Sequence, residues 1–283
     1  MPVRPEWCFA QKTPVPFFAA GQLAKALNDT FVYDGCYSKF RGRRHGAPAG
    51  GHSRDRFVVS IQTHDQVGNR ARGDRFGTLL DPAQQRLAAG LLLLAPHVPL
   101  LFMGQEYGET RPFPFFCSFE DSQLIEAVRT GRRQEFASFA WRGEIPDPQD
   151  ERTFESAKLT WAWPDGSHHA GLRRLYRDLL TARRTWPALR DFKNRTAELL
   201  PDTGLPSVLR LTRGGADVTN TLVAFFNLGG SEQPIPTSHP DGYNILLSSE
   251  ASDYGGARTV EDSRPVLLPF EFRVYGPITW KSL

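Results

Sequence analysis

The segment Gln62 to Asn69 (QTHDQVGN) holds the densest group of side chains that could do chemistry. It places an imidazole, His64, directly beside a carboxylate, Asp65. Such a pair can bind sugar hydroxyls, act as a base or ligate a metal. The amides of Gln62, Gln66 and Asn69 add donors and acceptors suited to a polyhydroxyl ligand. The plainer alternative is that His64 and Asp65 only cap a turn and pair with each other.

A second polar segment, residues 105–109 (QEYGE), precedes a group of phenylalanines. Gln105 and Glu106 are candidate substrate contacts, because aromatic rings beside polar groups can stack on the apolar faces of sugar rings. Packing in a core is the better explanation for the rings themselves, which are Phe113, Phe115, Phe116 and Phe119. Glu106 and Glu109 carry no strong signal by themselves.

Both polar segments follow short apolar runs. Residues 57–61 (FVVSI) and 98–102 (VPLLF) are typical of buried strands. Between them, Asp81 predicts a helix N-cap, with Pro82 at the first helical position and Gln84 completing a capping box. Strand, loop, helix, strand and loop in this order indicate parallel strands, and ligands in such folds lie beyond the carboxyl ends of the strands. The two polar segments occupy that position.

In the remaining chain, the pattern of apolar and turn residues changes near residue 197. Helices are predicted at residues 21–27, about 121–140 and 169–185, the last closed by Trp186 and Pro187. Farther on, short apolar runs alternate with turn residues, which is typical of an antiparallel β-sandwich. We therefore predict a partial βα region over residues 1–190 and a β-sandwich domain over residues 191–283, and the chain length suits two domains.

Charge is close to balanced, with 34 Lys and Arg against 31 Asp and Glu, which is too small an excess to imply a polyanionic partner. A local excess of basic residues lies between Lys39 and Arg75. Such a cluster could face nucleic acid, but we expect its arginines to pair with carboxylates of a neighbouring wall and hold the loops in place. We predict no nucleic-acid partner.

No cofactor or metal ion is expected, because the sequence has no HExxH, GxSxG, GxGxxG or P-loop motif. The three cysteines show no CxxC spacing, which fits a reducing compartment. No uninterrupted apolar run reaches the roughly twenty residues of a membrane span. We therefore predict a cytoplasmic protein without a membrane partner.

Four blocks resemble the malto-oligosyltrehalose trehalohydrolases of the α-amylase superfamily of glycoside hydrolases: VYDGCYSKFRGRRHG, FVVSIQTHDQVGNRARGDR, PLLFMGQEYGETRPFPFF and AVRTGRRQEFASF. The resemblance extends over roughly residues 21–283, with Cys36 where the family pattern has glutamine. It implies the last two strands and helices of a (β/α)8 TIM barrel followed by a β-sandwich. The implied reaction is hydrolysis of the α-1,4 bond next to the terminal trehalose of maltooligosyltrehalose, which releases trehalose. The implied transition-state stabiliser is Asp65, with His64 beside it on the same sugar.

Hydrolysis of this kind also needs a carboxylate nucleophile and a carboxylic acid that protonates the leaving oxygen. The family carries both on earlier barrel strands, whereas 64 residues precede Asp65 here and a complete barrel takes about 250. We expect a C-terminal portion that is inactive alone on maltooligosyltrehalose or another α-glucan. One alternative is a split enzyme, in which a second polypeptide supplies the missing barrel strands. Another is a non-catalytic sugar-binding module built on the sandwich.

Overall fold

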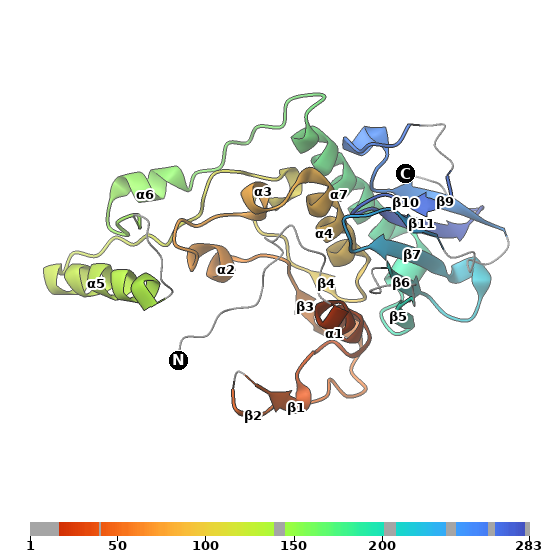
Figure 1. Cartoon of the computed structure of the whole chain (residues 1–283), viewed down its shortest axis with the longest axis horizontal. Helices are drawn as coiled ribbons and strands as arrows, with labels where there is room; N and C mark the ends of the chain where they lie inside the picture. Colours follow the sequence, from red (N-terminus) through yellow and green to blue (C-terminus); the bar gives the residue numbers. More distant parts are fainter. Residues whose placement is uncertain are drawn as a thin grey trace.

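The computed structural model describes residues 17–39, 41–138, 145–200, 208–235, 242–259 and 264–280. Cys8 and the outer ends of the two predicted domains lie outside these ranges. An antiparallel sheet forms one end of the molecule, and two helices, α4 (Pro82–Leu94) and α7 (His168–Thr185), lie against it (Figure 1). The other end carries α5 (Ser122–Ser138) and α6 (Glu151–Ser156) (Figure 1).

The predicted strand–helix–strand unit is present. Strand β3 (Val58–Val59) pairs in parallel with β4 (Val98–Pro99), and α4 connects them. Helix α4 begins as predicted: the Asp81 side chain accepts from the backbone of Gln84, whose own side chain accepts from the backbone of Asp81. Both strands are shorter than the predicted runs.

The described part of the chain contains no closed barrel, because β3 and β4 form a sheet of two strands. Each strand leaves an apolar side chain at the surface, with Val58 of β3 64% and Val98 of β4 36% exposed. A β-branched residue at that exposure is unusual for a strand in the middle of a sheet. The pair therefore has the form of one unit of a larger parallel sheet.

The sheet predicted after residue 197 is antiparallel and has five strands in the order β5-β6-β7-β11-β9. The strands are β5 (Arg195–Leu199), β6 (Val208–Arg213), β7 (Leu222–Asn227), β9 (Tyr243–Ser248) and β11 (Phe272–Pro277). A second sheet of two short strands, β8 (Gln233–Pro234) and β10 (Val266–Leu267), accompanies it.

Side chains alternate across β7, and all six of its residues are buried. Ala224 and Phe226 join the core shared with the helices, whereas Val223 and Phe225 pack in a separate cluster that includes Leu267 of β10. The five-stranded sheet is therefore covered on both faces, by helices on one side and by the β8–β10 pair on the other.

The core is continuous between the βα region and the sheet, since one cluster includes Leu93 of α4, Leu175 of α7 and Phe272 of β11. Helix and sheet approach most closely at Gly90, where an added Cβ would lie 2.4 Å from the Phe272 ring. A buried ion pair joins the same parts, with Arg86 Nη2 2.5 Å from Glu250 Oε1. The predicted boundary at residue 190 therefore does not interrupt the packing.

Two arginines, the buried Arg213 and the half-buried Arg183, bond the carbonyl groups at the end of α4. Arg183 of α7 donates to the carbonyl oxygens of Leu93 and Ala95, and Arg213 of β6 donates to that of Leu94. These carbonyls have no partner within the helix, so the guanidinium groups satisfy them. Burial is the main cause that lowers the pKa of Arg213, to about 9.

The other predicted helices are present with modest differences. Helix α1 (Phe17–Asp29) is longer than predicted and packs on β5. Helix α5 ends within the described residues at Ser138, and Trp186 closes α7 as expected. The short helix α8 (Pro187–Arg190) follows. Elements that were not predicted are the hairpin β1 (Asp34–Ser38) and β2 (Arg43–Gly46), helix α6, and the short helices α2 (His64–Gly68) and α3 (Phe76–Leu79).

Candidate functional site

The His64–Asp65 pair opens α2, directly beyond the carboxyl end of β3. Thr63 precedes the helix in an extended conformation, which turns the chain away from the strand. The side chains of His64 and Asp65 are 72% and 78% exposed, and His64 Nε2 lies 3.3 Å from Asp65 Oδ1. The two groups do pair locally, as the plainer alternative held, yet both remain accessible to a ligand.

The amides near this pair differ in their surroundings. Gln66 is exposed, with no partner recorded among the described residues. Asn69 is exposed too, and its Oδ1 accepts from Arg132 Nη1 of α5 at 3.3 Å. Arg132 also donates to the carbonyl of Gly68 at 2.9 Å and lies over the ring of Phe115. Helix α5 is therefore attached to the end of α2 through one guanidinium group.

The second segment forms a 3-10 turn, η2 (Gln105–Tyr107), after β4. Gly104 and Gly108 bound this turn with φ values of +82° and +70°, a left-handed conformation that favours glycine. An added Cβ at Gly104 would also meet Glu109 at 2.8 Å. The MGQEYGE spacing thus produces a tight reversal that brings the turn back toward α7.

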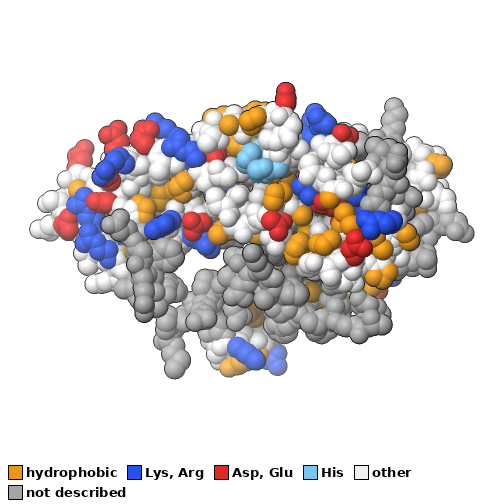
Figure 2. Space-filling view, turned by 45° about the horizontal axis from the view of Figure 1, so that its top comes forward, with side chains coloured by type: hydrophobic (Ala, Val, Ile, Leu, Met, Phe, Trp, Pro, Cys, Tyr) orange, Lys and Arg blue, Asp and Glu red, His pale blue; other side chains and the backbone are white. Residues whose placement is uncertain are grey.

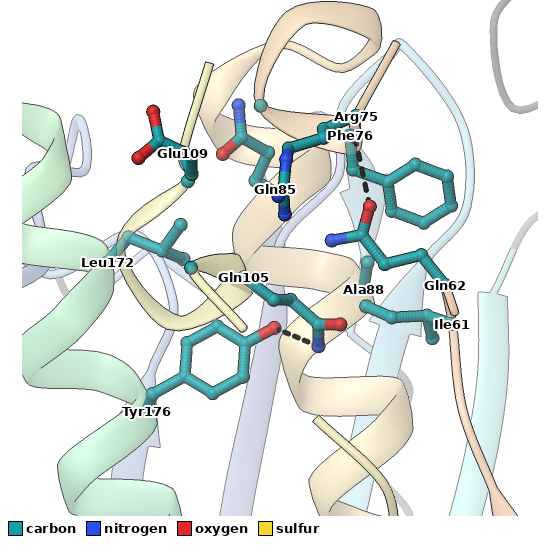
Figure 3. Close-up of a pocket in the computed structure, with 13 residues that line it drawn as sticks. Ile61, Gln62, Arg75, Phe76, Gln85, Ala88, Gln105, Glu109, Leu172 and Tyr176 are labelled. Carbon is teal, nitrogen blue, oxygen red and sulfur yellow. Dashed lines mark hydrogen bonds between the residues drawn. The ribbon is translucent and has the colours of Figure 1, made fainter. Parts of the chain in front are cut away.

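Gln105, predicted as a substrate contact, is buried in this turn. Its Nε2 donates to the hydroxyl of Tyr176 at 2.8 Å, and its Oε1 accepts from the backbone of Phe102 (Figure 3). The amide is thus engaged inside the protein, where it fixes the turn against α7. Glu106 is half-buried and has no hydrogen bond recorded within the described ranges, so its carboxylate is the freer of the two groups.

Glu109 is the most heavily bonded side chain of the second loop, although no sequence pattern singles it out. It is buried and accepts hydrogen bonds from Tyr107, Thr110, Arg111 and twice from Thr160. Burial works to raise the pKa of this carboxyl, but the backbone bonds from Arg111 and Thr160 and the hydroxyl bonds prevail, and the pKa is lowered. Glu109 therefore stays ionised and anchors the loop.

Arg75 joins the two loops from inside. Its side chain is buried, donates to the carbonyl of Met103 at 2.8 Å, and lies over the rings of Phe102 and Phe113. Burial lowers its pKa, while Glu109 acts in the opposite direction. Arg70, by contrast, forms an ion pair with Asp74 at 3.3 Å, four residues away in the same loop. Neither arginine thus pairs with a carboxylate of a neighbouring wall as expected, because the Arg70 pair is local and Arg75 bonds a carbonyl.

A cavity between the loops is lined by Gln62, Arg75, Gln105, Glu109 and Tyr176 among others (Figure 3). Gln62 turns inward and accepts from the backbone of Phe76 at 3.2 Å. The cavity volume is about 10 Å³, close to that of one water molecule and far too small for a sugar ring. The exposed surface around His64 and Asp65, and not this cavity, is the candidate site.

Two tryptophan side chains lie beside the second loop. The rings of Trp163 and Trp161 lie 5.1 Å and 6.5 Å from that of Tyr107. Trp161 is 63% exposed and has a φ of +52°, which is uncommon for a residue with a bulky side chain. The Glu109–Thr160 bonds hold the preceding residue, and the indole of Trp161 lies exposed beside the second loop.

No three His, Cys, Asp or Glu side chains gather as a metal site would require in the part of the chain that the structure describes. No helix among the described residues is long and apolar enough to cross a membrane. The face shown in Figure 2 mixes basic, acidic and hydrophobic side chains without a broad area of one charge.

Comparisons with known proteins identify the relatives of this chain. A malto-oligosyltrehalose trehalohydrolase from Rhizobium sp. (strain M-11) is 40% identical over 247 residues, which are 86% of this chain and 40% of that protein. The enzyme of the same name from Saccharolobus solfataricus is 46% identical over 145 residues, 51% of this chain and 25% of its own length. The chain is homologous to part of malto-oligosyltrehalose trehalohydrolase. No protein-family model matches it.

A solved structure supports the same relationship for this trehalohydrolase-like chain. A Salmonella typhimurium protein provisionally named as an alpha amylase superposes with a TM-score of 0.73 at 32% identity, over 90% of this chain and 41% of that protein. The resemblance to the α-amylase superfamily is therefore confirmed. The chain spans between 25% and 41% of the length of these three proteins, so their activity is not carried over with the fold.

Proposed function

We propose that this trehalohydrolase-like chain forms the substrate-binding part of a glycoside hydrolase that cleaves the α-1,4 bond next to the terminal trehalose of maltooligosyltrehalose. The observation that carries the proposal is the exposed His64–Asp65 pair beyond the carboxyl end of a parallel strand, in a chain 40% identical to a named trehalohydrolase. Ligands of parallel βα folds lie at this end of the strands.

Asp65 acts as the transition-state stabiliser in this proposal. Its carboxylate accepts hydrogen bonds from ring hydroxyls, and these bonds strengthen as the sugar flattens toward an oxocarbenium-like state. His64, at 3.3 Å, orients the carboxylate and contacts the same sugar. Gln66, Asn69 and Glu106 are the neighbouring polar groups that can bind further hydroxyls, whereas the buried Gln105 contributes by positioning the turn.

The nucleophile and the general acid are supplied from outside this pair of strands. A retaining glycosidase needs two carboxyl groups about 5–5.5 Å apart across the scissile bond. Within the described residues the parallel sheet is limited to β3 and β4, and α1 and the β1–β2 hairpin precede it without joining it. Strands that continue this sheet would bring the two carboxylates to the same edge as Asp65. The 283 residues alone are therefore expected to be inactive unless strands that carry those carboxylates complete the sheet.

The five-stranded sheet does not favour the alternative of an independent sugar-binding module. Its central strand β7 is buried on both sides, so a ligand would have to bind at an edge. No observation in the described residues points to such a ligand, and the sheet instead packs on α4 and α7 as a support for the βα unit.

The experiment that tests the proposal uses this chain mixed with a polypeptide comprising the part of the Rhizobium enzyme that lies outside the matched region. Asp65→Asn should lower kcat/KM for trehalose release by at least about 100-fold, the scale of losing one preorganised transition-state contact. Asp55→Asn is the matched control, since Asp55 is also exposed but lies before β3, at the opposite end of the strand. Equal activity of the two variants would remove Asp65 from the mechanism.

A further inference from the structure

A polar hollow of about 180 Å³ lies beyond the amino end of β3, the end opposite to the His64–Asp65 pair. Its walls come from residues 50–54, which lead into β3, and residues 192–195, which lead into β5. An added Cβ at Gly50 or Gly51 would meet no atom within 4 Å, so the backbone here borders open space. The hollow is smaller than the 300–1,000 Å³ usual for drug-sized ligands and suits a small molecule.

Three cationic side chains line this hollow: Arg54, Lys193 and Arg195. Arg54 is 8% exposed and donates only to carbonyl oxygens, those of His52 at 2.8 Å and Asn28 at 3.2 Å, while its Nε has no partner. Arg195 likewise donates to the carbonyls of Lys193 and Asn28 and has an unpartnered Nε. The two guanidinium groups thus converge on one neutral oxygen, with no carboxylate bonded to either.

The nearby carboxylates are engaged elsewhere. Asp29 pairs with Lys25 at 2.9 Å, and Asp191 accepts from the backbones of Lys193 and Asn194. Burial lowers the pKa of Arg195 and the charge of Arg54 lowers it further, while the charges of Asp29 and Asp191 act in the opposite direction without bonding to Arg195. Charged groups in a protein interior normally have an ionic or well-bonded partner. Two converging cations whose bonded partners are neutral carbonyl oxygens leave a place for an anion from solution.

We propose that this hollow binds a phosphate or phosphate-monoester anion, at a site separate from the glycosidase site. Two guanidinium groups and an ammonium group around one space match the tetrahedral, multiply charged phosphate better than a single carboxylate. The half-buried ring of Phe192 lines the same hollow and gives an apolar surface for the carbon part of a sugar phosphate.

Calorimetric titration of the full chain with inorganic phosphate and with glucose 6-phosphate tests the proposal, with glucose as the uncharged control. We expect phosphate binding that weakens steeply with added salt and no binding of glucose at the same concentrations. Tighter binding of glucose 6-phosphate than of phosphate would identify a sugar phosphate as the ligand. The reverse order would identify the free anion.

Two variants assign the binding to this hollow. Arg195→Gln should raise the Kd for phosphate about tenfold or more, because it removes a charge-assisted donor. Lys193→Gln should raise it severalfold, and this side chain is exposed without a recorded partner, so its replacement does not threaten folding. The control is Arg56→Gln, an exposed arginine near the hollow that does not line it. No phosphate binding by the unchanged protein, or equal binding by the Lys193 variant and the control, would overturn the proposal.

Discussion

Replacing Glu109 with glutamine tests whether a buried carboxylate holds the second site loop in place. Oε1 of Glu109 accepts from the backbones of Thr110 and Arg111 at 2.9 Å each, and Oε2 accepts from the Thr160 backbone at 2.6 Å and from two hydroxyls. The glutamine amide has one oxygen, so its NH2 group takes the place of the other carboxylate oxygen and faces hydrogen-bond donors there.

The cost follows from the donors that the amide leaves unpaired. Either orientation of the new side chain deprives at least one backbone N–H of its acceptor, and placing the NH2 at the Oε1 position deprives two. An unsatisfied buried donor costs about 1–3 kcal/mol, and the hydroxyls of Tyr107 and Thr160 can partly adapt. We therefore expect Glu109→Gln to lower the free energy of unfolding by about 2–4 kcal/mol.

Urea denaturation of the full chain measures this loss, and hydrogen exchange locates it. Exchange should quicken in residues 103–116 and 158–163, which the carboxylate joins, while the five-stranded sheet stays protected. Glu106→Gln is the matched control, since Glu106 lies three positions away and has no hydrogen bond recorded in the described ranges. An unfolding free energy for Glu109→Gln within about 0.5 kcal/mol of the control would refute the role of this carboxylate.

Two further predictions concern the junction between the helices and the sheet. Burial, with Arg54 and Arg195 adding to it, lowers the pKa of His97 to about 4, so the folded state resists a proton that the unfolded chain accepts below pH 6.5. The free energy of unfolding should thus fall between pH 6.5 and pH 4. The fall is about 3 kcal/mol at most, and about 2 kcal/mol once solvent screening of the charges is included. His97→Gln should remove this fall from the profile of unfolding free energy against pH. Parallel profiles for the variant and the unchanged protein would disprove the role of His97. Arg86→Met leaves Glu250 buried and unpaired, and should cost about 3–5 kcal/mol in urea denaturation. Adding Glu250→Gln to Arg86→Met should recover part of that loss. Equal stability of the single variant Arg86→Met and the double variant would contradict the pairing.

Local sequence signals predicted the βα unit well. The capping box of Asp81 and Gln84 involves residues three apart, so its geometry follows from the sequence once a helix forms. The β-branched run at residues 57–61 predicted β3, although the strand is shorter than the run. Helix α7 was predicted nearly to its bounds because its apolar spacing and its closing Trp186 are both local features.

Contacts between distant residues were the part that the sequence could not supply. Gln105 is turned inward by Tyr176, 71 positions away, and Glu109 is bonded by Thr160, 51 positions away. No sequence pattern links Tyr176 or Thr160 to the loop that each contacts. The hairpin of β1 and β2 was missed because its residues are mostly polar or small, and helix α6 because it spans six residues.

The basic cluster was misjudged for a related reason. Arginines of the cluster were expected to pair with carboxylates, and composition alone cannot show that Arg54 and Arg75 donate to backbone carbonyls. Such bonds depend on where helices and turns end in space. The candidate pair His64–Asp65, by contrast, follows a strand end directly in sequence, and its exposure there agrees with a ligand-binding role.

The most direct test of the proposed function is trehalose release from maltooligosyltrehalose by this chain alone and after mixing with the complementary part of the Rhizobium enzyme. We predict no release above the uncatalysed rate by either polypeptide alone, and release on mixing, since only the mixture has a nucleophile, a general acid and Asp65 at one edge of a sheet. Release by the separate chain at the rate of the mixture would contradict the proposal that the chemistry comes from outside β3 and β4.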